Sequence, residues 1–157
     1  FHALVRAGVP MVMTAHILYP LIDPQYPATM SELVLKRFLR DEMGFEGVVV
    51  SDDLDMLAAA KAFREPKAYA DSFRATCDTF IVARNPDPHS LRPLECAKLM
   101  YQALKGRLLS EEMLFTAWSR VNRLLDQVPP SGSPRVLDRI TLQEHGELAA
   151  ETRGKRS

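Results

Sequence analysis

A run of β-branched residues leads directly to a carboxylate in residues 44–56, which read GFEGVVVSDDLDM. The three valines at 48–50 show no polar alternation, which is typical of a parallel strand covered on both faces. Gly44 and Gly47 mark the turn before this strand, and Asp52 follows it. The segment therefore predicts a buried parallel strand that carries an acidic side chain at its carboxyl end.

The residues before this strand predict another strand and two helices. Residues 1–7 have the pattern of a helix that ends at Gly8, and the apolar run at 10–13 indicates a buried strand. Residues 19–27 contain three prolines and no periodicity, so we expect an ordered connection outside the core.

A capping box is predicted at Thr29, with Glu32 reaching back from the third helical position. The helix that follows is expected to bury one apolar face and to end at Gly44. The residues of that face are Leu35, Phe38, Leu39 and Met43.

The residues after Asp52 continue the alternation of helices and strands. Ser110 is expected to cap a last amphipathic helix, in which Trp118 is interpreted as a packing residue. Between these points we predict helices at 54–63 and 66–76, a strand at 79–83, and a helix that begins at Asp87-Pro88 and runs to about Leu104.

The predicted fold class is α/β, with about three parallel strands and their helices. Three parallel strands cannot close a barrel, so the pattern calls for more strands than this chain supplies. The chain opens without an initiator Met, and we expect an N-terminal portion to precede it. The prediction is therefore the C-terminal portion of an eight-stranded (β/α) TIM-type barrel over residues 1–128, followed by a Pro/Ser-rich linker and a loosely ordered polar tail over 129–157.

The composition is that of a soluble globular protein, with 157 residues of which 46% are hydrophobic and 25% charged. Twenty basic residues balance twenty acidic ones, so no net field favours nucleic acid or an anionic membrane as a partner. No apolar run approaches the roughly 18 residues of a membrane span. Cys77 and Cys96 are interpreted as small buried hydrophobic residues.

Catalytic groups of parallel α/β barrels lie at the carboxyl ends of the strands, which makes Asp52 and His16 the two candidates. A retaining glycosidase needs an ionised carboxylate that attacks the anomeric carbon, and Asp52 is placed for that role. Asp53 cannot be its partner, because neighbours on an extended segment point to opposite sides.

Other interpretations of these residues remain open at this point. Asp53 and Asp55 are expected to cap or begin the helix that follows, although Asp52, Asp53 and Asp55 could instead form a divalent-metal cluster for phosphoryl transfer. His16 either contacts a sugar hydroxyl or is bonded internally to hold the loop after it. Strand-end aspartates such as Asp52 also serve as structural partners of ion pairs.

Three segments together resemble the N-terminal domain of glycoside hydrolase family 3, over roughly residues 1–127. They are AGVPMVMTAH at 7–16, PAT at 27–29 and GFEGVVVSDDLDM at 44–56. The resemblance is strongest to the bacterial β-N-acetylglucosaminidases of cell-wall recycling. It implies that Asp52 is the nucleophile, that the product keeps its β configuration, and that the substrate is a β-linked N-acetylglucosamine unit, for example on a muropeptide.

The same resemblance implies no metal or organic cofactor, and it favours the cytoplasm as the location. It also implies that the acid/base histidine and the groups that hold the N-acetyl sugar lie upstream of this chain. His16 matches the family's strand end and not its mobile acid/base loop, so it is expected to bind substrate, not to transfer the proton. We expect the chain alone to be inactive and unstable.

Two alternatives to this function are kept. One is a family relative acting on β-glucosides or β-xylosides, which more often carries Ser-Asp-Trp where this chain has Ser51-Asp52-Asp53. The other is a non-catalytic remnant that binds sugars or protein partners without turnover.

Overall fold

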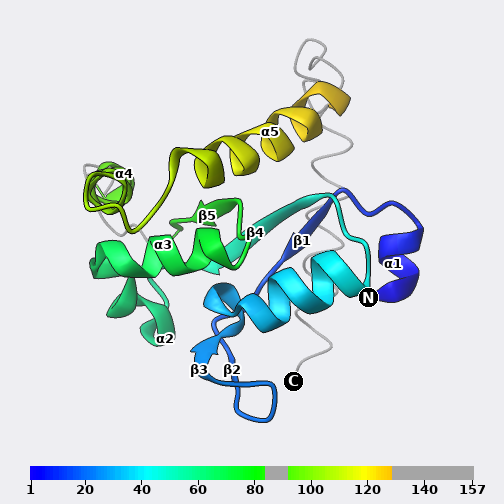
Figure 1. Cartoon of the computed structure of the whole chain (residues 1–157), viewed down its shortest axis with the longest axis horizontal. Helices are drawn as coiled ribbons and strands as arrows, with labels where there is room; N and C mark the ends of the chain where they lie inside the picture. The colour runs from blue at the N-terminus through cyan, green and yellow to red at the C-terminus, as the bar shows by residue number, and fades with distance from the viewer. Residues whose placement is uncertain (84–91, 129–157) are drawn as a thin grey trace, which may run out of the picture. The chain divides into compact units, whose positions relative to one another are not determined.

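The computed structural model describes residues 1–83 and 92–128, and a three-stranded parallel sheet lies at the centre of this part of the chain (Figure 1). β1 (Met11–Met13), β4 (Val48–Asp53) and β5 (Thr79–Ile81) lie in the order β1-β4-β5. β4 is the middle strand and pairs in parallel with both neighbours. The predicted α/β pattern with three parallel strands is therefore confirmed.

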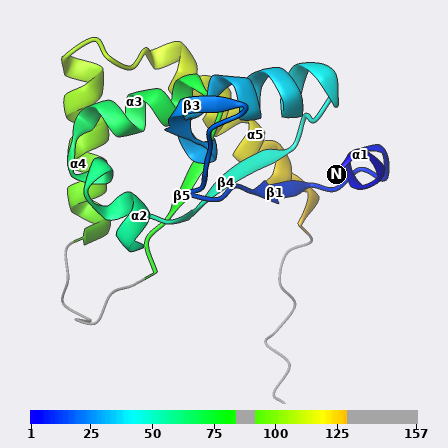
Figure 2. The same cartoon turned by 90° about the horizontal axis from the view of Figure 1, so that it is seen from below.

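Helices connect the strands. η2 (Leu33–Glu42) is a wide helix of π type between β1 and β4, and α3 (Pro66–Arg74) precedes β5. η2 and α3 lie on the same side of the sheet (Figure 2). After β5 come α4 (Arg92–Lys105) and α5 (Glu111–Gln127). The short helices are α1 (His2–Arg6), η1 (Ala28–Met30), α2 (Leu57–Ala60) and η3 (Ala62–Arg64).

The strand predicted at 10–13 is present but is not buried. Val12 and its partner Val49 pack against the buried leucines of η2. The side chains of Met11 and Met13 point to the opposite face, where they are 41% and 57% exposed. The prediction of burial is wrong because, among the described residues, β1 is an edge strand with a helix packed on one face.

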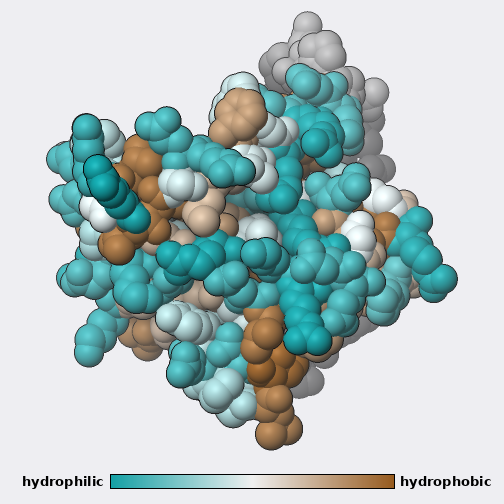
Figure 3. All heavy atoms as spheres, in the orientation of Figure 1, coloured by the Kyte–Doolittle hydropathy of each residue, from teal (hydrophilic) through white to brown (hydrophobic). Residues whose placement is uncertain are grey.

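A small antiparallel hairpin occupies most of the segment predicted as an irregular connection at 19–27. β2 (Leu18–Tyr19) pairs with β3 (Asp23–Pro27), and the pairing shifts register between the two residues of β2. The three prolines led to the prediction of an irregular connection. Proline is nevertheless compatible with short edge strands, so a hairpin can form here. Leu21 and Ile22 at the tip are exposed, and Figure 3 shows apolar side chains gathered there.

The carboxylate of Asp23 ties this hairpin to the start of η2. Its Oδ1 accepts hydrogen bonds from the amides of Gln25 and Tyr26 at 3.0 and 3.1 Å, and Oδ2 accepts one from Ser31 Oγ at 2.7 Å. These donors, the Ser31 hydroxyl foremost, lower the pKa of Asp23 below its usual 3.8 although burial opposes the shift.

The depressed pKa of Asp23 predicts a specific loss of stability in acid. The carboxylate contributes stability above its unfolded-state pKa, and this contribution is lost as the pH falls through the lower folded-state pKa. We expect the free energy of unfolding to decrease below pH 3.8 more steeply in the wild-type protein than in Asp23→Asn. Urea unfolding as a function of pH measures this, with Asp41→Asn on the exposed side of η2 as the control. Equal slopes in the wild type and Asp23→Asn would contradict the prediction.

Ser31 caps η2 instead of the predicted pair Thr29 and Glu32. The amide of Val34 donates to Ser31 Oγ at 3.2 Å, whereas Thr29 lies in η1 with its hydroxyl turned to other partners. Glu32 forms an exposed ion pair with Lys36. The capping-box prediction is wrong because η1 interposes a separate turn. The predicted end at Gly44 is confirmed by its φ of +70°.

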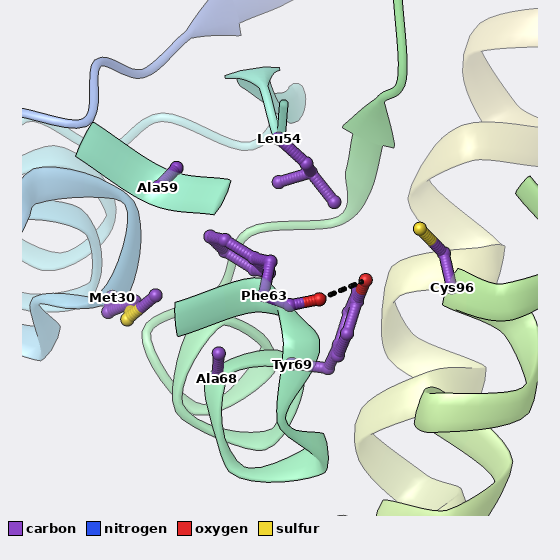
Figure 4. Close-up of a cluster of buried hydrophobic side chains, with 7 residues drawn as sticks. All are labelled: Met30, Leu54, Ala59, Phe63, Ala68, Tyr69 and Cys96. Atoms are coloured by element: carbon purple, nitrogen blue, oxygen red, sulfur yellow. Dashed lines mark hydrogen bonds between the residues drawn. The ribbon is translucent and has the colours of Figure 1, made fainter. Parts of the chain in front are cut away.

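The core between η1, α3 and α4 is shown in Figure 4, where Tyr69 Oη donates to the carbonyl of Phe63 at 3.2 Å. Phe80 of β5 packs against this cluster and meets Phe63, Tyr69 and Phe73 edge-on, with ring centroids 5.3 to 6.0 Å apart. Such aromatic pairs add about 0.5–1.5 kcal/mol each beyond the area that they bury. These contacts hold β5, an outer strand of the described sheet, against η3 and α3.

Several predicted elements are shorter than expected or placed differently. The helix predicted at 54–63 is divided into α2 and η3, and β5 ends at Ile81. Ser110 caps α5 as predicted, since Met113 N donates to its hydroxyl. Trp118 is 59% exposed and lies beside Phe115, so its interpretation as a packing residue is wrong.

Parts of the prediction lie outside the described residues. These are the start of the helix at Asp87-Pro88 and the linker and tail at 129–157. Backbone contacts divide the chain into a unit of residues 1–127 and one of residues 128–157. The character predicted for the second segment stays a prediction.

A buried ion cluster joins the amino-terminal ends of β4 and β5 to two helices. Asp78 Oδ2 accepts hydrogen bonds from Arg40 of η2 at 2.7 Å and from the amide of Val49 at 2.8 Å. Asp78 Oδ1 accepts one from Arg120 of α5 at 2.8 Å. The side chain of Asp78 is 1% exposed and that of Arg40 is 8% exposed. This cluster lies at the end of the sheet opposite to Asp52.

The two cysteines are buried free thiols, as predicted. Burial, with Asp78 beside it, raises the pKa of the Cys77 thiol to about 12. A thiolate nucleophile is therefore not formed there at neutral pH. Within residues 1–83 and 92–128, none of the helices combines the length and the hydrophobicity of a membrane span.

Candidate functional site

A β-bulge at the carboxyl end of β4 shapes the candidate site. Val50 is paired with Thr79, but the next pairing joins Asp53 to Ile81, so β4 holds one residue more than β5 over this step. The amide of Ile81 donates to Ser51 Oγ at 3.1 Å, and Ser51 Oγ donates to the Asp52 carbonyl at 2.7 Å. The fully buried Ser51 hydroxyl thus takes a place in the ladder, and such bulges re-aim side chains near active sites.

Asp52 lies within this bulge and is partly buried. Its Oδ1 accepts a hydrogen bond from the amide of Asp53 at 2.8 Å. No hydrogen bond to its other carboxylate oxygen is found in residues 1–83 and 92–128. The carboxylate is therefore oriented by one oxygen, while the second can approach another molecule.

Asp53 and Asp55 do not cap the next helix, in contrast to the prediction. Asp53 Oδ1 accepts hydrogen bonds from the amides of Asp55 at 3.1 Å and Ala83 at 3.0 Å, which ties the end of β4 to the residues after β5. Asp55 Oδ1 pairs with Arg92 Nε of α4 at 2.9 Å. The prediction is wrong because partners distant in sequence occupy these carboxylates before α2 begins at Leu57.

The three aspartates differ in their partners, which bears on the metal-cluster alternative. Asp52 accepts a hydrogen bond from the amide of the next residue, Asp53 from an amide beyond the end of β5, and Asp55 from α4. Among the described residues, no group of three or more possible ligands converges on one point. The geometry favours separate roles for the three carboxylates.

His16 is the third residue after the end of β1 and is 9% exposed. Its Nε2 is 3.2 Å from the carbonyl oxygen of Asp52, and its Nδ1 is 3.0 Å from Thr29 Oγ1. Both ring nitrogens therefore have partners within the protein. These contacts favour the alternative in which His16 holds neighbouring segments, and a direct contact with substrate stays a prediction.

Sequence reasoning missed two polar residues of this site. Ser51 precedes Asp52 in the sequence, but the partner that gives its hydroxyl a role, the amide of Ile81, is 30 positions away. Thr29 was interpreted as a helix cap, and no local signal links it to Thr14 and His16, which are 15 and 13 positions away. His2 is exposed in α1, whereas His89 and His145 lie outside the described residues.

The sequence of this chain resembles the sequences of known proteins. Residues 1–124 match the model of the family described as glycosyl hydrolase family 3 N terminal domain. The beta-hexosaminidase of Neisseria meningitidis is 42% identical over 87 residues, which are 55% of this chain and 24% of that protein. The beta-hexosaminidase of Alkalilimnicola ehrlichii is 42% identical over 130 residues, which are 79% of this chain and 36% of that protein.

A solved structure resembles this one in the same way. The glycoside hydrolase family 3 beta-N-acetylglucosaminidase from Paenibacillus sp. superposes with a TM-score of 0.72 at 26% sequence identity. The match covers 91% of this chain and 28% of that chain. The chain thus spans between about a quarter and about a third of the length of these relatives.

Proposed function

The chain belongs to glycosyl hydrolase family 3, by its match to the N-terminal domain of that family, and from this membership we propose a function for the protein that carries it. The full-length protein, meaning the polypeptide that contains these residues and the rest of the barrel, is a retaining β-N-acetylhexosaminidase. It removes terminal β-linked N-acetylglucosamine, with muropeptides as the favoured substrates. The observation that carries the proposal is the carboxylate of Asp52, held by one oxygen at a bulge where β4 ends.

In this mechanism Asp52 is the nucleophile. The less constrained carboxylate oxygen attacks the anomeric carbon, the bond from that carbon to the leaving oxygen breaks, and an acid supplies a proton to the leaving oxygen. Water then attacks the anomeric carbon of the glycosyl ester and gives a proton to the same acid/base group, while the bond from that carbon to Asp52 breaks and the carboxylate is released. Two displacements at one carbon return the β configuration. The acid/base group belongs to the preceding part of the polypeptide.

Exposed apolar surface along β1 supports the proposal that this chain is the C-terminal portion of an eight-stranded barrel. An open apolar groove of about 390 Å³ lies beside β1 and η2, with Phe1, Tyr19 and Phe38 among its lining residues. These side chains are 40% to 74% exposed. A preceding strand and helix of the same polypeptide would pair with the free edge of β1 and cover this groove.

A covalent label tests the assignment of Asp52. The full-length protein is incubated with a slow fluorinated N-acetylglucosaminyl donor, and intact mass and peptide mapping locate the adduct. We expect one glycosyl group on the peptide that contains Asp52. Turnover of ordinary substrate without that label would contradict Asp52 as nucleophile, whereas neither turnover nor label would favour the non-catalytic alternative.

The isolated 157-residue chain is expected to be inactive. It provides the proposed nucleophile, but the proposed acid/base group lies in the rest of the barrel. The strand and helix that are proposed to cover the exposed apolar surface along β1 also belong to that part. An aryl N-acetyl-β-glucosaminide assay compares the isolated chain with the full-length protein at equal concentration. Clear turnover by the isolated chain would contradict the expectation.

The β-glucosidase or β-xylosidase alternative is tested with matched substrates. Aryl β-glucoside and aryl β-xyloside carry the same leaving group as the N-acetyl compound, so differences in kcat/KM report recognition of the sugar. The proposal expects the N-acetyl substrate to give the highest kcat/KM. A higher value for either of the others would favour the corresponding relative.

A further inference from the structure

Thr29 is the centre of a buried hydrogen-bond cluster beside the candidate nucleophile. Its Oγ1 is 2.6 Å from Thr14 Oγ1, 3.0 Å from His16 Nδ1 and 3.2 Å from the carbonyl oxygen of Ala15. Thr29 is fully buried, while Thr14 and His16 are 8% and 9% exposed. A buried cluster of this kind strongly prefers arrangements in which every polar atom has a partner.

The direction of each hydrogen bond follows from the chemistry of its ends. The Asp52 carbonyl can only accept, so Nε2 of His16 must carry the proton. In the neutral imidazole, Nδ1 then accepts from the Thr29 hydroxyl, which in turn accepts from Thr14. The single proton of the Thr29 hydroxyl is within reach of two acceptors, the Ala15 carbonyl at 3.2 Å and Nδ1 of His16 at 3.0 Å. When the proton is donated to Nδ1, Thr29 stabilises the same tautomer of His16 that the Asp52 carbonyl requires.

The chain of hydrogen bonds ends on the peptide that holds the nucleophile. The peptide group between Asp52 and Asp53 accepts from His16 and Ser51 at its oxygen, and at its nitrogen it donates to Asp52 Oδ1. Because this group is planar and rigid, fixing its oxygen also fixes the direction of its N–H. The orientation of the Asp52 carboxylate therefore depends on His16.

We propose that Thr29 is a positioning residue for Asp52: its hydroxyl holds His16 in the Nε2-protonated tautomer, and His16 fixes the peptide that orients the carboxylate. The inference rests on the proposed function, in which Asp52 attacks the sugar. Thr29 is fully buried, so in this proposal it acts through His16 and not by its own contact with a substrate.

Substitutions at Thr29 in the full-length protein test this role. Thr29→Val keeps the shape and removes the hydroxyl, Thr29→Ser keeps the hydroxyl, and Thr116→Val on the exposed face of α5 is the matched control. A small displacement of a reacting group can lower the rate by up to about 100-fold. We expect Thr29→Val to lower kcat by about 10- to 100-fold with KM changed by less than about threefold. Thr29→Ser and the control are expected to keep wild-type kinetics.

The tautomer of His16 provides a measurement that does not depend on activity. Nitrogen-15 NMR of the imidazole is expected to show protonated Nε2 in the wild type and in Thr29→Ser, and a changed proton distribution in Thr29→Val. If Thr29→Val does not fold, Thr29→Ala takes its place in both experiments.

The possible outcomes separate the two hypotheses. Wild-type turnover with a kcat of Thr29→Val within about twofold of the wild type overturns the positioning role, and so does an equal loss of kcat in Thr29→Ser. Protonated Nδ1 in the wild type also overturns it. If the wild-type protein neither turns over nor is labelled at Asp52, the proposed function fails, and the NMR result alone decides whether Thr29 controls His16.

Discussion

Replacing Asp52 by alanine in the full-length protein is expected to lower turnover of an aryl N-acetyl-β-glucosaminide by roughly 10⁴-fold or more, the scale found when a catalytic nucleophile is removed. No other carboxylate of the site can substitute, because Asp53 is bonded to the amides of Asp55 and Ala83 and Asp55 is paired with Arg92. Steady-state kinetics measure kcat and KM. The loss is expected in kcat, since the attack on carbon is the step removed.

Added azide distinguishes a lost nucleophile from a damaged fold. In Asp52→Ala the small anion can occupy the space of the carboxylate and attack the anomeric carbon from the same side. A single displacement then gives the α-glycosyl azide, which NMR identifies. Asp41→Ala, an exposed position on η2, is the matched control and is expected to retain activity. Activity of Asp52→Ala within tenfold of the wild type, roughly 1.4 kcal/mol in the barrier, would contradict the nucleophile assignment.

Replacing Asp78 by asparagine is expected to lower the free energy of unfolding by about 3–5 kcal/mol, the range for breaking a buried ion pair from one side. The amide of asparagine has no charge to offset the guanidinium of Arg40, which is 8% exposed and already has its pKa lowered by burial. Arg120 loses its partner as well, at 21% exposure. The negative charge of Asp78, and not the shape of its side chain, is therefore expected to stabilise the fold.

Urea unfolding of the full-length protein, followed by circular dichroism, measures this loss. Asp126→Asn makes the same chemical change at an exposed position of α5 and is expected to change the free energy of unfolding by at most about 0.5 kcal/mol. Because Asp78 and Asp52 lie at opposite ends of the sheet, kcat of folded Asp78→Asn is expected to be close to that of the wild type. A free energy of unfolding equal to that of the wild type would mean that the cluster makes no net contribution.

The parallel strands could be predicted because their signals are local. The valines at 48–50 cannot alternate between core and solvent, and the left-handed conformation at Gly44 ends η2 as the glycine suggested. The place of Asp52 at the carboxyl end of β4 follows from the same run. The motif around it also led to the family, whose model matches residues 1–124.

Errors arose where a residue's partner lies far away in the sequence. Thr29 has the pattern of a helix cap, but its hydroxyl forms hydrogen bonds with Thr14 and His16, which precede the hairpin in the sequence. Asp53 and Asp55 also have the pattern of caps, yet Ala83 and Arg92 occupy their carboxylates. Local preference yields in these cases to hydrogen bonds that only the folded chain provides.

Gly47 illustrates the division between local pattern and packing. The sequence identifies it as a turn residue, and the fold shows that a Cβ there would lie 2.4 Å from the carbonyl oxygen of Pro10. Local composition and periodicity thus predict the three strands of the parallel sheet, their parallel arrangement and the position of Asp52, but not the hairpin of β2 and β3. The bulge at Ser51, the tautomer of His16 and the burial of Asp78 arise from contacts between segments as many as 42 positions apart, and such contacts exist only after the strands have paired.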